Sequence, residues 1–583
     1  MEASEVKKLA ETYVNQETNP VFKKEVEDLL ASDSPEAAKD LEDRFYTRLA
    51  FGTGGMRGVI GGGYNRMNSY VIRRTTQGLA NYVTKQNFDN PSAAIAYDSR
   101  HFSKEFARDA ACVLAAAGIK TYIFKELRPT PQLSFAVRHL GATIGIVITA
   151  SHNPAEYNGY KVYWNDGAQI VPPHDKGIVE EVSNLAGSAA MMDRAEAMEK
   201  GLIVELGPEI DEEFFNMVGR VMIRPELVRE KGSDLNIVYT PLHGTGSVMV
   251  EPTLKRLGIE VMTVPEQREP DGNFPTVKFP NPEEASAMEL ALKLGRKHKA
   301  DIVLGTDPDS DRIGIAVPDA HGEYTLVSGN QLGCLLADYI FSSRKDLGKL
   351  PKRPAFINTI VTTPLQAIIA KSHGAECYQT LTGFKWIAGK IREFESQADG
   401  PSFVFGCEES YGFMVGAEVR DKDAVSASAM TAEMALYHVK NGKSVLQHLD
   451  ELYEEHGYWE DRLISRYFKG QAGLTVMKGM MAALRENPPD TLGGISIAKT
   501  RDYLSGKEDL PKSDVLQFEL ADGSVVNARP SGTEPKIKFY ISCPADRNGS
   551  GAGRTDGGDR STAARKVDAI EAEIQTLIDK AAG

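Results

Sequence analysis

Cysteine is scarce in this sequence, and its cysteines stand far apart. The 583 residues contain five of them, with no C-x-x-C pair, at Cys112, Cys334, Cys377, Cys407 and Cys543. Widely spaced single cysteines exclude a disulfide scaffold and a cysteine zinc site. They are typical of reduced thiols in a cytosolic protein.

Long apolar runs and an excess of positive charge are also missing. No stretch is long enough to cross a membrane, and the charged residues 1–8 lack the apolar centre of a signal peptide. The 81 acidic side chains outnumber the 67 basic ones and give a net charge of −14. Such an acidic protein is unsuited to nucleic acid and to anionic membranes. We therefore expect a cytoplasmic location, no nucleic-acid partner and no membrane partner.

The chain is too long for a single hydrophobic core, and about four domains are expected. Short apolar strands alternate with amphipathic helices over most of its length, which indicates an α/β fold class. The last part has antiparallel character, with expected strands 515–520 and 525–528 on either side of a tight turn. We predict three mixed α/β domains and a C-terminal α+β domain, with boundaries 1–206, 207–325, 326–456 and 457–583.

Individual strands can be predicted from the apolar runs. The expected strands of the first three domains are 93–97, 120–124, 144–149, 235–239, 260–264, 301–304, 355–360 and 402–405. A glycine-rich polar stretch, 547–560, is expected to be a flexible surface loop, and we assign it no role.

The most informative segment is Thr149–Asn158, with the sequence TASHNPAEYN. It follows the apolar run 144–149, so we expect a strand that delivers Ser151 to an exposed turn at the start of the next helix. Backbone N–H groups at such a position would stabilise a phosphate carried by the serine. A turn that only caps a helix is the alternative. Three other segments that require a phosphate or a metal favour the phosphate.

Three aspartates, Asp307, Asp309 and Asp311, follow the expected strand 301–304 at alternate positions. Ligands of α/β sheets bind at the carboxyl ends of strands, and oxygen-only ligands suit Mg²⁺. An EF-hand is excluded because loop positions 6 and 12 hold Arg312 and Pro318 instead of glycine and glutamate. An acidic surface turn is the less favoured alternative.

Three further segments carry groups that suit a phosphate or a sugar. Arg529–Pro535, RPSGTEP, offers hydroxyl and N–H donors around a glycine, a set that suits a phosphate. Gly406–Gly412, GCEESYG, offers acceptors for sugar hydroxyls at the end of a strand. The glycine-rich Phe51–Gly58 lacks the spacing of a dinucleotide site but can bring Arg57 close to a phosphate.

Taken in order, the motifs TASHNP, DPDSDR, CEESYG and RPSGTEP resemble the α-D-phosphohexomutase family over nearly the full length, in particular its long phosphoglucomutase- and phosphopentomutase-like members. The resemblance implies a four-domain architecture around a central cleft. It implies that Ser151 carries a phosphoryl group in the resting enzyme and binds one Mg²⁺ per chain together with Asp307, Asp309 and Asp311. The implied catalytic residues are Ser151, His152, Arg57, Lys161 and Lys385. The implied substrate-binding residues are Glu408, Ser410, Arg529, Ser531, Gly532, Thr533 and Lys538.

The expected activity is the reversible interconversion of glucose 1-phosphate and glucose 6-phosphate, an intramolecular phosphotransfer of the isomerase class. Phosphoserine would form glucose 1,6-bisphosphate, which serves as intermediate and activator. Lys161 is the candidate general acid or base, and its alternative role is that of a charge partner. Small phosphosugars are the expected partners of a monomer or homodimer. The alternative activities are those of a phosphomannomutase or of a phosphopentomutase acting on ribose or deoxyribose 1-phosphate. A non-catalytic phosphosugar-binding regulator and a Mg²⁺ phosphatase are less favoured.

Overall fold

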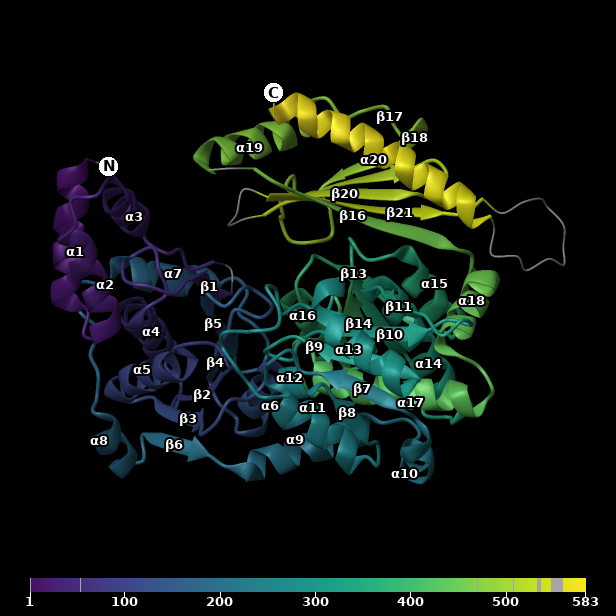
Figure 1. Ribbon diagram of the computed structural model, residues 1–583, viewed down its shortest axis with the longest axis horizontal. Coiled ribbons are helices and arrows are strands. Elements are labelled where there is room, and N and C mark those ends of the chain that lie inside the picture. Colours follow the sequence, from purple (N-terminus) through teal and green to yellow (C-terminus); the bar gives the residue numbers. More distant parts are fainter. Residues whose placement is uncertain are drawn as a thin grey trace. The chain divides into compact units, whose positions relative to one another are not determined.

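The computed structural model describes residues 2–52, 54–468, 470–506, 508–531, 536–546 and 559–582. The chain divides into two compact units, and Figure 1 labels their helices and strands. Unit 1 comprises Met1–Val327 and Tyr411–Tyr437, and unit 2 comprises Ser328–Ser410 and His438–Gly583. Residues 532–535 of the expected phosphate segment and residues 547–558 of the expected glycine-rich loop lie outside the described part of the chain.

The first sheet of unit 1 has the strand order β1-β5-β4-β2-β3-β6. Strands β2, β3, β4 and β6 run parallel, and β5 runs antiparallel to both β4 and β1. The strands are β1 Gly55–Val59, β2 Ser92–Tyr97, β3 Lys120–Phe124, β4 Ile144–Ile148, β5 Tyr157–Trp164 and β6 Ile203–Leu206. The accompanying helices are α4 Ser69–Lys85, α5 Ser103–Ala116, α6 Thr130–His139, α7 His174–Asn184 and α8 Arg194–Glu199.

Strand β4 lies in the interior of this sheet, and its sequence explains why. Its residues IGIVI are all buried, as expected of a strand that is covered on both faces. Gly145 allows helix α6 to pack closely, because a Cβ atom there would lie 2.6 Å from Cγ2 of Val137. Burial and close packing therefore hold the end of strand β4 in position, and with it the start of the polar segment that follows.

Three helices precede the first sheet, α1 Ala3–Gln16, α2 Pro20–Leu30 and α3 Pro35–Phe45. Val6, Ala10 and Tyr13 of α1 are buried, at the spacing of one helix face. The ring of Tyr13 meets those of Phe45 and Tyr64 edge to face, at centroid distances of 5.7 and 5.6 Å. Aromatic packing thus attaches these helices to the α/β core.

The second sheet of unit 1 has the order β11-β10-β9-β7-β8. Its strands are β7 Ile237–Thr240, β8 Val261–Thr263, β9 Ile302–Thr306, β10 Ile313–Pro318 and β11 Tyr324–Val327. The helices are α9 Pro208–Val221, α10 Pro225–Lys231, α11 Gly246–Arg256, α12 Pro265–Arg268 and α13 Ala285–His298, with a 3₁₀ turn at Gly232–Asp234. Strand β15, Gly412–Val415, belongs to unit 1, and α17, Ala424–Lys440, begins there.

Unit 2 contains a parallel arrangement and an antiparallel sheet. Strands β13 Glu376–Thr380, β12 Pro354–Thr359 and β14 Ser402–Glu408 pair in parallel, with helices α14 Gly329–Asp346, α15 Pro364–Ser372, α16 Phe384–Glu395 and α18 Val445–His456. The antiparallel sheet has the order β16-β21-β20-β19-β18-β17. Its elements are β16 Trp459–Tyr467, α19 Gly470–Glu486, β17 Thr491–Leu492, β18 Ile495–Asp502, β19 Leu516–Leu520, β20 Val525–Pro530, β21 Lys536–Pro544 and α20 Arg560–Ala582.

The predicted fold class is confirmed, with three mixed α/β sheets followed by a C-terminal α+β sheet. The predicted hairpin is present as the antiparallel pair β19 and β20. All five cysteines are free thiols, as their spacing predicts. None of the helices in the described ranges is both long and apolar enough to cross a membrane.

Candidate active site

Ser151 lies in a buried turn between β4 and β5. The expectation of an exposed turn that leads into a helix is wrong, because Ser151 is 3% exposed and the next element is the antiparallel strand β5. Two consecutive turns reverse the chain, through hydrogen bonds from Asn153 N to Ala150 O and from Tyr157 N to Pro154 O, both 3.1 Å. The helix N-terminus that would have stabilised a phosphate is therefore missing at this turn.

The structure instead brings Ser151 to the aspartate segment, 156 residues further along the chain. The hydroxyl of Ser151 donates to Oδ2 of Asp307 over 2.6 Å and lies 3.2 Å from Nδ1 of His152. Burial lowers the pKa of His152 well below its usual range, and the positive charges of Arg312 and Arg57 add to this effect. The imidazole beside the serine is therefore neutral at physiological pH.

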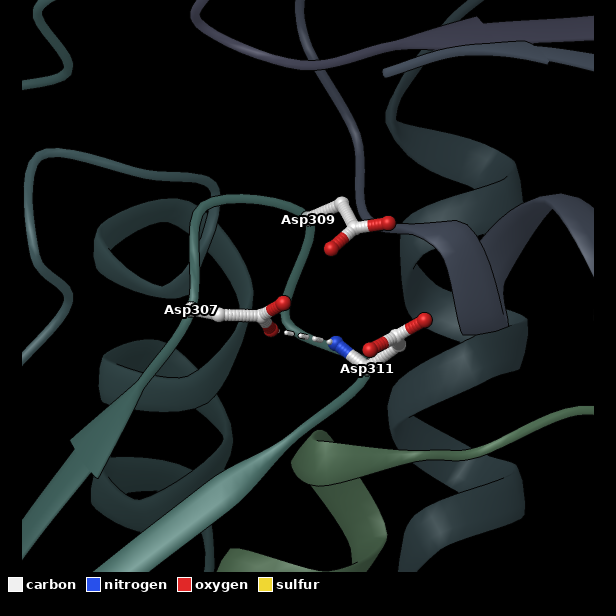
Figure 2. A group of neighbouring side chains, drawn as sticks. All are labelled: Asp307, Asp309 and Asp311. Atoms are coloured by element: carbon white, nitrogen blue, oxygen red, sulfur yellow. Dashed lines mark hydrogen bonds between the residues drawn. The ribbon is translucent and has the colours of Figure 1, made fainter. Parts of the chain in front are cut away.

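Asp307, Asp309 and Asp311 lie on the turn between β9 and β10 (Figure 2). All three are buried, and one ligand atom of each lies within 4.8 Å of the others. Within the described residues, Oδ1 of Asp309 and Oδ1 of Asp311 have no hydrogen-bond partner. Buried carboxylate oxygens without partners are costly unless a cation compensates them. The three residues therefore fit a hard divalent cation such as Mg²⁺.

The charges of this cluster are unevenly compensated. Burial, together with the carboxylates of Asp309 and Asp311, raises the pKa of Asp307 well above its ordinary value. Burial acts in the same direction on Asp309, but the ammonium group of Lys161, together with hydrogen bonds to Asp307 and Thr130, outweighs it and lowers the pKa of that carboxyl. Three carboxylates this close repel one another, so a divalent cation would relieve the repulsion.

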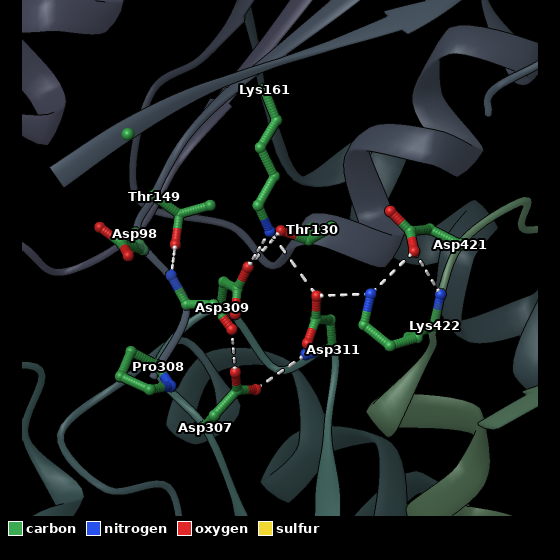
Figure 3. A network of polar contacts seen from close by, with 12 residues as sticks. Asp98, Thr130, Thr149, Lys161, Asp307, Pro308, Asp309, Asp311, Asp421 and Lys422 are labelled. Atoms are coloured by element: carbon green, nitrogen blue, oxygen red, sulfur yellow. Dashed lines mark hydrogen bonds and ion pairs between the residues drawn. The ribbon is translucent and has the colours of Figure 1, made fainter. Parts of the chain in front are cut away.

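Two lysines reach the cluster (Figure 3). Lys161, on β5, places Nζ 2.9 Å from Oδ2 of Asp309 and 3.6 Å from Oδ2 of Asp311. Burial opposes its charge, but these two carboxylates outweigh burial and raise the pKa of Lys161, so the ammonium form persists. Lys422 places Nζ 3.1 Å from Asp311 Oδ2 and 3.1 Å from Asp421 Oδ1. Sequence reasoning missed Lys422, although the alternating charges of RDKD at 420–423 were a visible signal.

Arg57 reaches the Ser151 turn from a third strand. The glycine-rich segment enters β1, and Arg57 is paired with Gly159 of β5. The exposed guanidinium donates from Nη1 to Oδ1 of Asn153 over 2.9 Å. The structure therefore brings together Ser151, His152, Arg57, Lys161 and the three aspartates, all within unit 1.

The remaining predicted residues that the structure describes lie in unit 2. Glu408 ends β14 and is buried, and its Oε1 accepts the backbone N–H of Gly383 over 2.5 Å. Gly383 has a φ of +116°, which favours glycine, and it precedes α16 with Lys385 in the first turn. The sugar segment and the Lys385 turn are thus linked by a hydrogen bond. Ser410 follows two residues after Glu408.

Arg529 of β20 and Lys538 of β21 are paired directly across the antiparallel ladder. Residues paired in this way share one face of the sheet, and like charges there repel. A bound anion would relieve this repulsion. Ser531 closes the end of β20 by donating its N–H to the carbonyl oxygen of Lys536 over 2.7 Å. Gly532 and Thr533 lie outside the described residues.

Glu409, in the GCEESYG segment, is a residue to which the sequence assigns no role, but the structure gives its carboxyl an unusual electrostatic environment. Burial raises its pKa to about 7, with a contribution from Glu408, while Lys538 and Arg529 act in the opposite direction. Its Oε2 has no hydrogen-bond partner among the residues that the structure describes. No sequence pattern distinguishes this carboxyl from the one before it.

Three domain families match the chain, and together they cover its first three domains. They are the phosphoglucomutase/phosphomannomutase α/β/α domain I at residues 48–187, domain II at 212–322 and domain III at 328–456. A phosphoglucomutase of Staphylococcus haemolyticus is 37% identical over 518 residues, covering 87% of this chain and 92% of that protein. A phosphoglucomutase of Staphylococcus aureus MRSA252 is 37% identical over 542 residues, covering 89% and 95%.

Solved structures share the fold at low sequence identity. The pp63/parafusin phosphoglucomutase of Paramecium, in an open form, has a TM-score of 0.69 at 17% identity and covers 92% of this chain and 95% of its own. A phosphoglucomutase/phosphomannomutase family protein of Burkholderia thailandensis has a TM-score of 0.65 at 18% identity, with coverages of 92% and 98%.

The chain belongs to the phosphoglucomutase/phosphomannomutase family, the α-D-phosphohexomutases. It is an enzyme of that family, a phosphotransferase mutase of the isomerase class. The relatives that bear the name phosphoglucomutase confirm this as the predicted main function.

Proposed function

We propose that the chain interconverts glucose 1-phosphate and glucose 6-phosphate through a phosphoserine at Ser151 and a glucose 1,6-bisphosphate intermediate. The observation that carries the proposal is the 2.6 Å contact between the Ser151 hydroxyl and Asp307, inside a buried cluster of three carboxylates. A serine hydroxyl next to a candidate cation site is suited to accept and donate a phosphoryl group.

The transfer is a substitution at phosphorus. The bond from Ser151 Oγ to phosphorus breaks while a bond from phosphorus to a sugar hydroxyl oxygen forms. The sugar hydroxyl loses a proton, and Ser151 Oγ gains one. We assign both transfers to Lys161, which the neighbouring carboxylates keep protonated: its ammonium group gives a proton to Ser151 Oγ, and the resulting amine takes up the proton of the sugar hydroxyl, so that Lys161 ends in its starting form.

Charge on the transferring phosphoryl oxygens requires positive partners. When bound, Mg²⁺ neutralises part of that charge, and Asp307, Asp309, Asp311 and Ser151 would hold it. Arg57 contacts the same turn and supplies a second positive charge. The neutral His152 can hydrogen-bond to the serine oxygen without adding charge of its own.

Recognition of the sugar and of the non-reacting phosphate is assigned to residues of unit 2. Glu408 and Ser410 would accept hydrogen bonds from sugar hydroxyls, and Lys385 would supply a further positive charge. The paired cations Arg529 and Lys538 support a phosphate site. The other residues assigned to that site are Ser531, Gly532 and Thr533. Cytoplasmic location and a monomeric or homodimeric state stay predictions.

The test measures kcat/KM for glucose 1-phosphate, mannose 1-phosphate and ribose 1-phosphate, with Mg²⁺ and a trace of the matching bisphosphate. We expect the highest value for glucose 1-phosphate. A preference for the pentose would overturn the sugar assignment and leave the role of Ser151 intact.

The covalent step is tested separately by intact-mass analysis. We expect one added phosphoryl group on the purified enzyme and none on Ser151→Ala, with turnover lost. Ser183→Ala, on the exposed side of α7, is the matched control and should keep both the added phosphoryl group and normal turnover. An active enzyme that never carries the phosphoryl group would refute the phosphoserine mechanism.

A further inference from the structure

Arg100 is buried beneath the Ser151 turn. It follows β2, and its side chain is fully inaccessible to solvent. Its guanidinium donates to the carbonyl oxygens of Ser151 at 2.5 Å, Pro154 at 2.7 Å and Tyr157 at 2.9 Å, and to that of Asn153 in a short contact. One side chain therefore binds four backbone carbonyls within seven residues.

The four contacts fix the orientation of the peptide groups in the turn. In a trans peptide the C=O and N–H point in opposite directions. Because the carbonyl of Ser151 points at Arg100, the N–H of His152 points away from it. The carbonyl oxygens of the turn thus point toward the positive charge of Arg100. This orientation keeps the negative ends of their dipoles away from the Ser151 side chain.

The backbone of the turn needs such support. Ser151 has a φ of +51°, in the left-handed region, which costs a non-glycine residue roughly 1 kcal/mol or more. A strained conformation persists only where the surroundings hold it. The hydrogen bond from Ser151 N to Thr149 Oγ1, at 2.8 Å, adds local support.

Arg100 is itself held in place. Its Nε lies 3.3 Å from Oδ2 of Asp98, which is also fully buried. Oδ1 of Asp98 accepts the backbone N–H of Arg100 over 3.0 Å and the hydroxyl of Ser103 over 2.8 Å. The guanidinium carbon lies 4.9 Å from the centre of the Phe274 ring. Arg100 therefore has a fixed position from which to orient the turn.

We propose that Arg100 is the positioning residue of the nucleophile, because its four carbonyl contacts hold the 151–157 turn so that the Ser151 hydroxyl faces the aspartate cluster. The inference rests on the proposed role of Ser151. Arg100 contacts no reacting atom, so it acts through the geometry of the turn. Arg100 does not bind the sugar or the non-reacting phosphate, since those roles are assigned to residues of unit 2.

The proposal predicts a specific kinetic defect. Lysine cannot replace the planar, five-donor guanidinium, so Arg100→Lys should let the turn relax. A displacement of about 1 Å at a reacting group costs roughly 100-fold in rate. We expect kcat to fall about 100-fold while KM for glucose 1-phosphate changes less than about threefold. In a single turnover, loss of the Ser151 phosphoryl group on addition of glucose 1-phosphate should slow by the same factor as kcat.

Arg74→Lys is the matched control. Arg74 also donates to two backbone carbonyls, those of Val182 at 3.1 Å and Leu185 at 2.9 Å, away from the Ser151 turn. Arg74→Lys should lower Tm but leave kcat within about twofold. Asp98→Asn keeps the guanidinium while removing its carboxylate partner, and it should give a smaller fall in kcat than Arg100→Lys. It serves as the test variant if Arg100→Lys does not fold.

Guanidinium ion added at low millimolar concentration should restore part of the single-turnover rate to Arg100→Ala and none to Ser151→Ala. A folded Arg100→Lys enzyme with normal kcat, or one in which KM rises as much as kcat falls, would overturn the positioning role. Failure of the proposed function is distinguishable, since it would appear as absence of the phosphoryl group from the wild-type enzyme.

Discussion

The carboxyl of Glu409 offers a quantitative test of the electrostatics of unit 2. Burial, with the help of Glu408, raises its folded-state pKa from 4.5 to about 7. A raised acid pKa contributes stability that is fully present below the unfolded-state value and is lost as the pH rises through the folded-state value. The contribution of Glu409 is therefore present near pH 4.5 and lost by about pH 7 to 8.

The magnitude follows from the shift. A difference of about 2.5 pKa units, at 1.36 kcal/mol per unit, corresponds to about 3 kcal/mol. Glutamine is neutral at every pH and does not suffer this loss. Relative to the wild type, Glu409→Gln should therefore gain about 2 to 3 kcal/mol in its free energy of unfolding between pH 5 and pH 8.

The assay is urea unfolding of both proteins at pH 5, 6, 7 and 8, followed by circular dichroism. Glu454→Gln, an exposed glutamate on α18, is the control and should show a difference that does not vary with pH. The reasoning is refuted if the difference between wild type and Glu409→Gln is equally flat. Glu409 would then ionise like an exposed carboxyl, although it is half-buried.

Two further predictions concern the metal site and the strand that carries Lys161. Asp309→Asn should abolish Mg²⁺-dependent turnover with the fold retained, whereas the control Asp28→Asn, in an exposed ion pair with Lys24, should leave turnover unchanged. Chelation should abolish the activity of the wild-type enzyme, and added Mg²⁺ should restore it. Activity that survives chelation would contradict the metal assignment. Gly159→Ala would place a Cβ atom 2.5 Å from the carbonyl oxygen of Thr149, so it should destabilise the protein by about 1 to 3 kcal/mol in thermal unfolding and reduce kcat. Gly219→Ala meets nothing within 4 Å and should be neutral or slightly stabilising, so equal losses in both variants would contradict the steric argument.

Local pattern predicted about half of the strands that the structure describes, some of them with small errors at the ends. The strand expected at 120–124 is β3, and the one expected at 355–360 is β12, displaced by one residue. The turn flanked by 515–520 and 525–528 is the hairpin of β19 and β20. These features depend on apolar periodicity and turn residues over short windows, which a single sequence displays directly.

The turn after β4 shows where short windows fail. The sequence identifies Ser151 itself, but it predicts an exposed turn that precedes a helix. The choice between helix and strand at 157–164 depends on pairing with β1 and β4, whose residues lie far away along the chain. Such pairing has no local sequence signature.

By itself, the sequence determined the α/β class, the order of the four motifs and the identity of Ser151 and the three aspartates as candidate site residues. Only the tertiary structure decided that Lys422 joins the aspartate cluster and that Arg100 binds four carbonyls of the nucleophile turn. It also decided that Glu409 is half-buried, with its charge partners on β20 and β21. The physical reason is that a side chain's charge state and orientation depend on burial and on neighbours brought in by distant segments. Residue type and local spacing fix which groups are available, and packing fixes what those groups do.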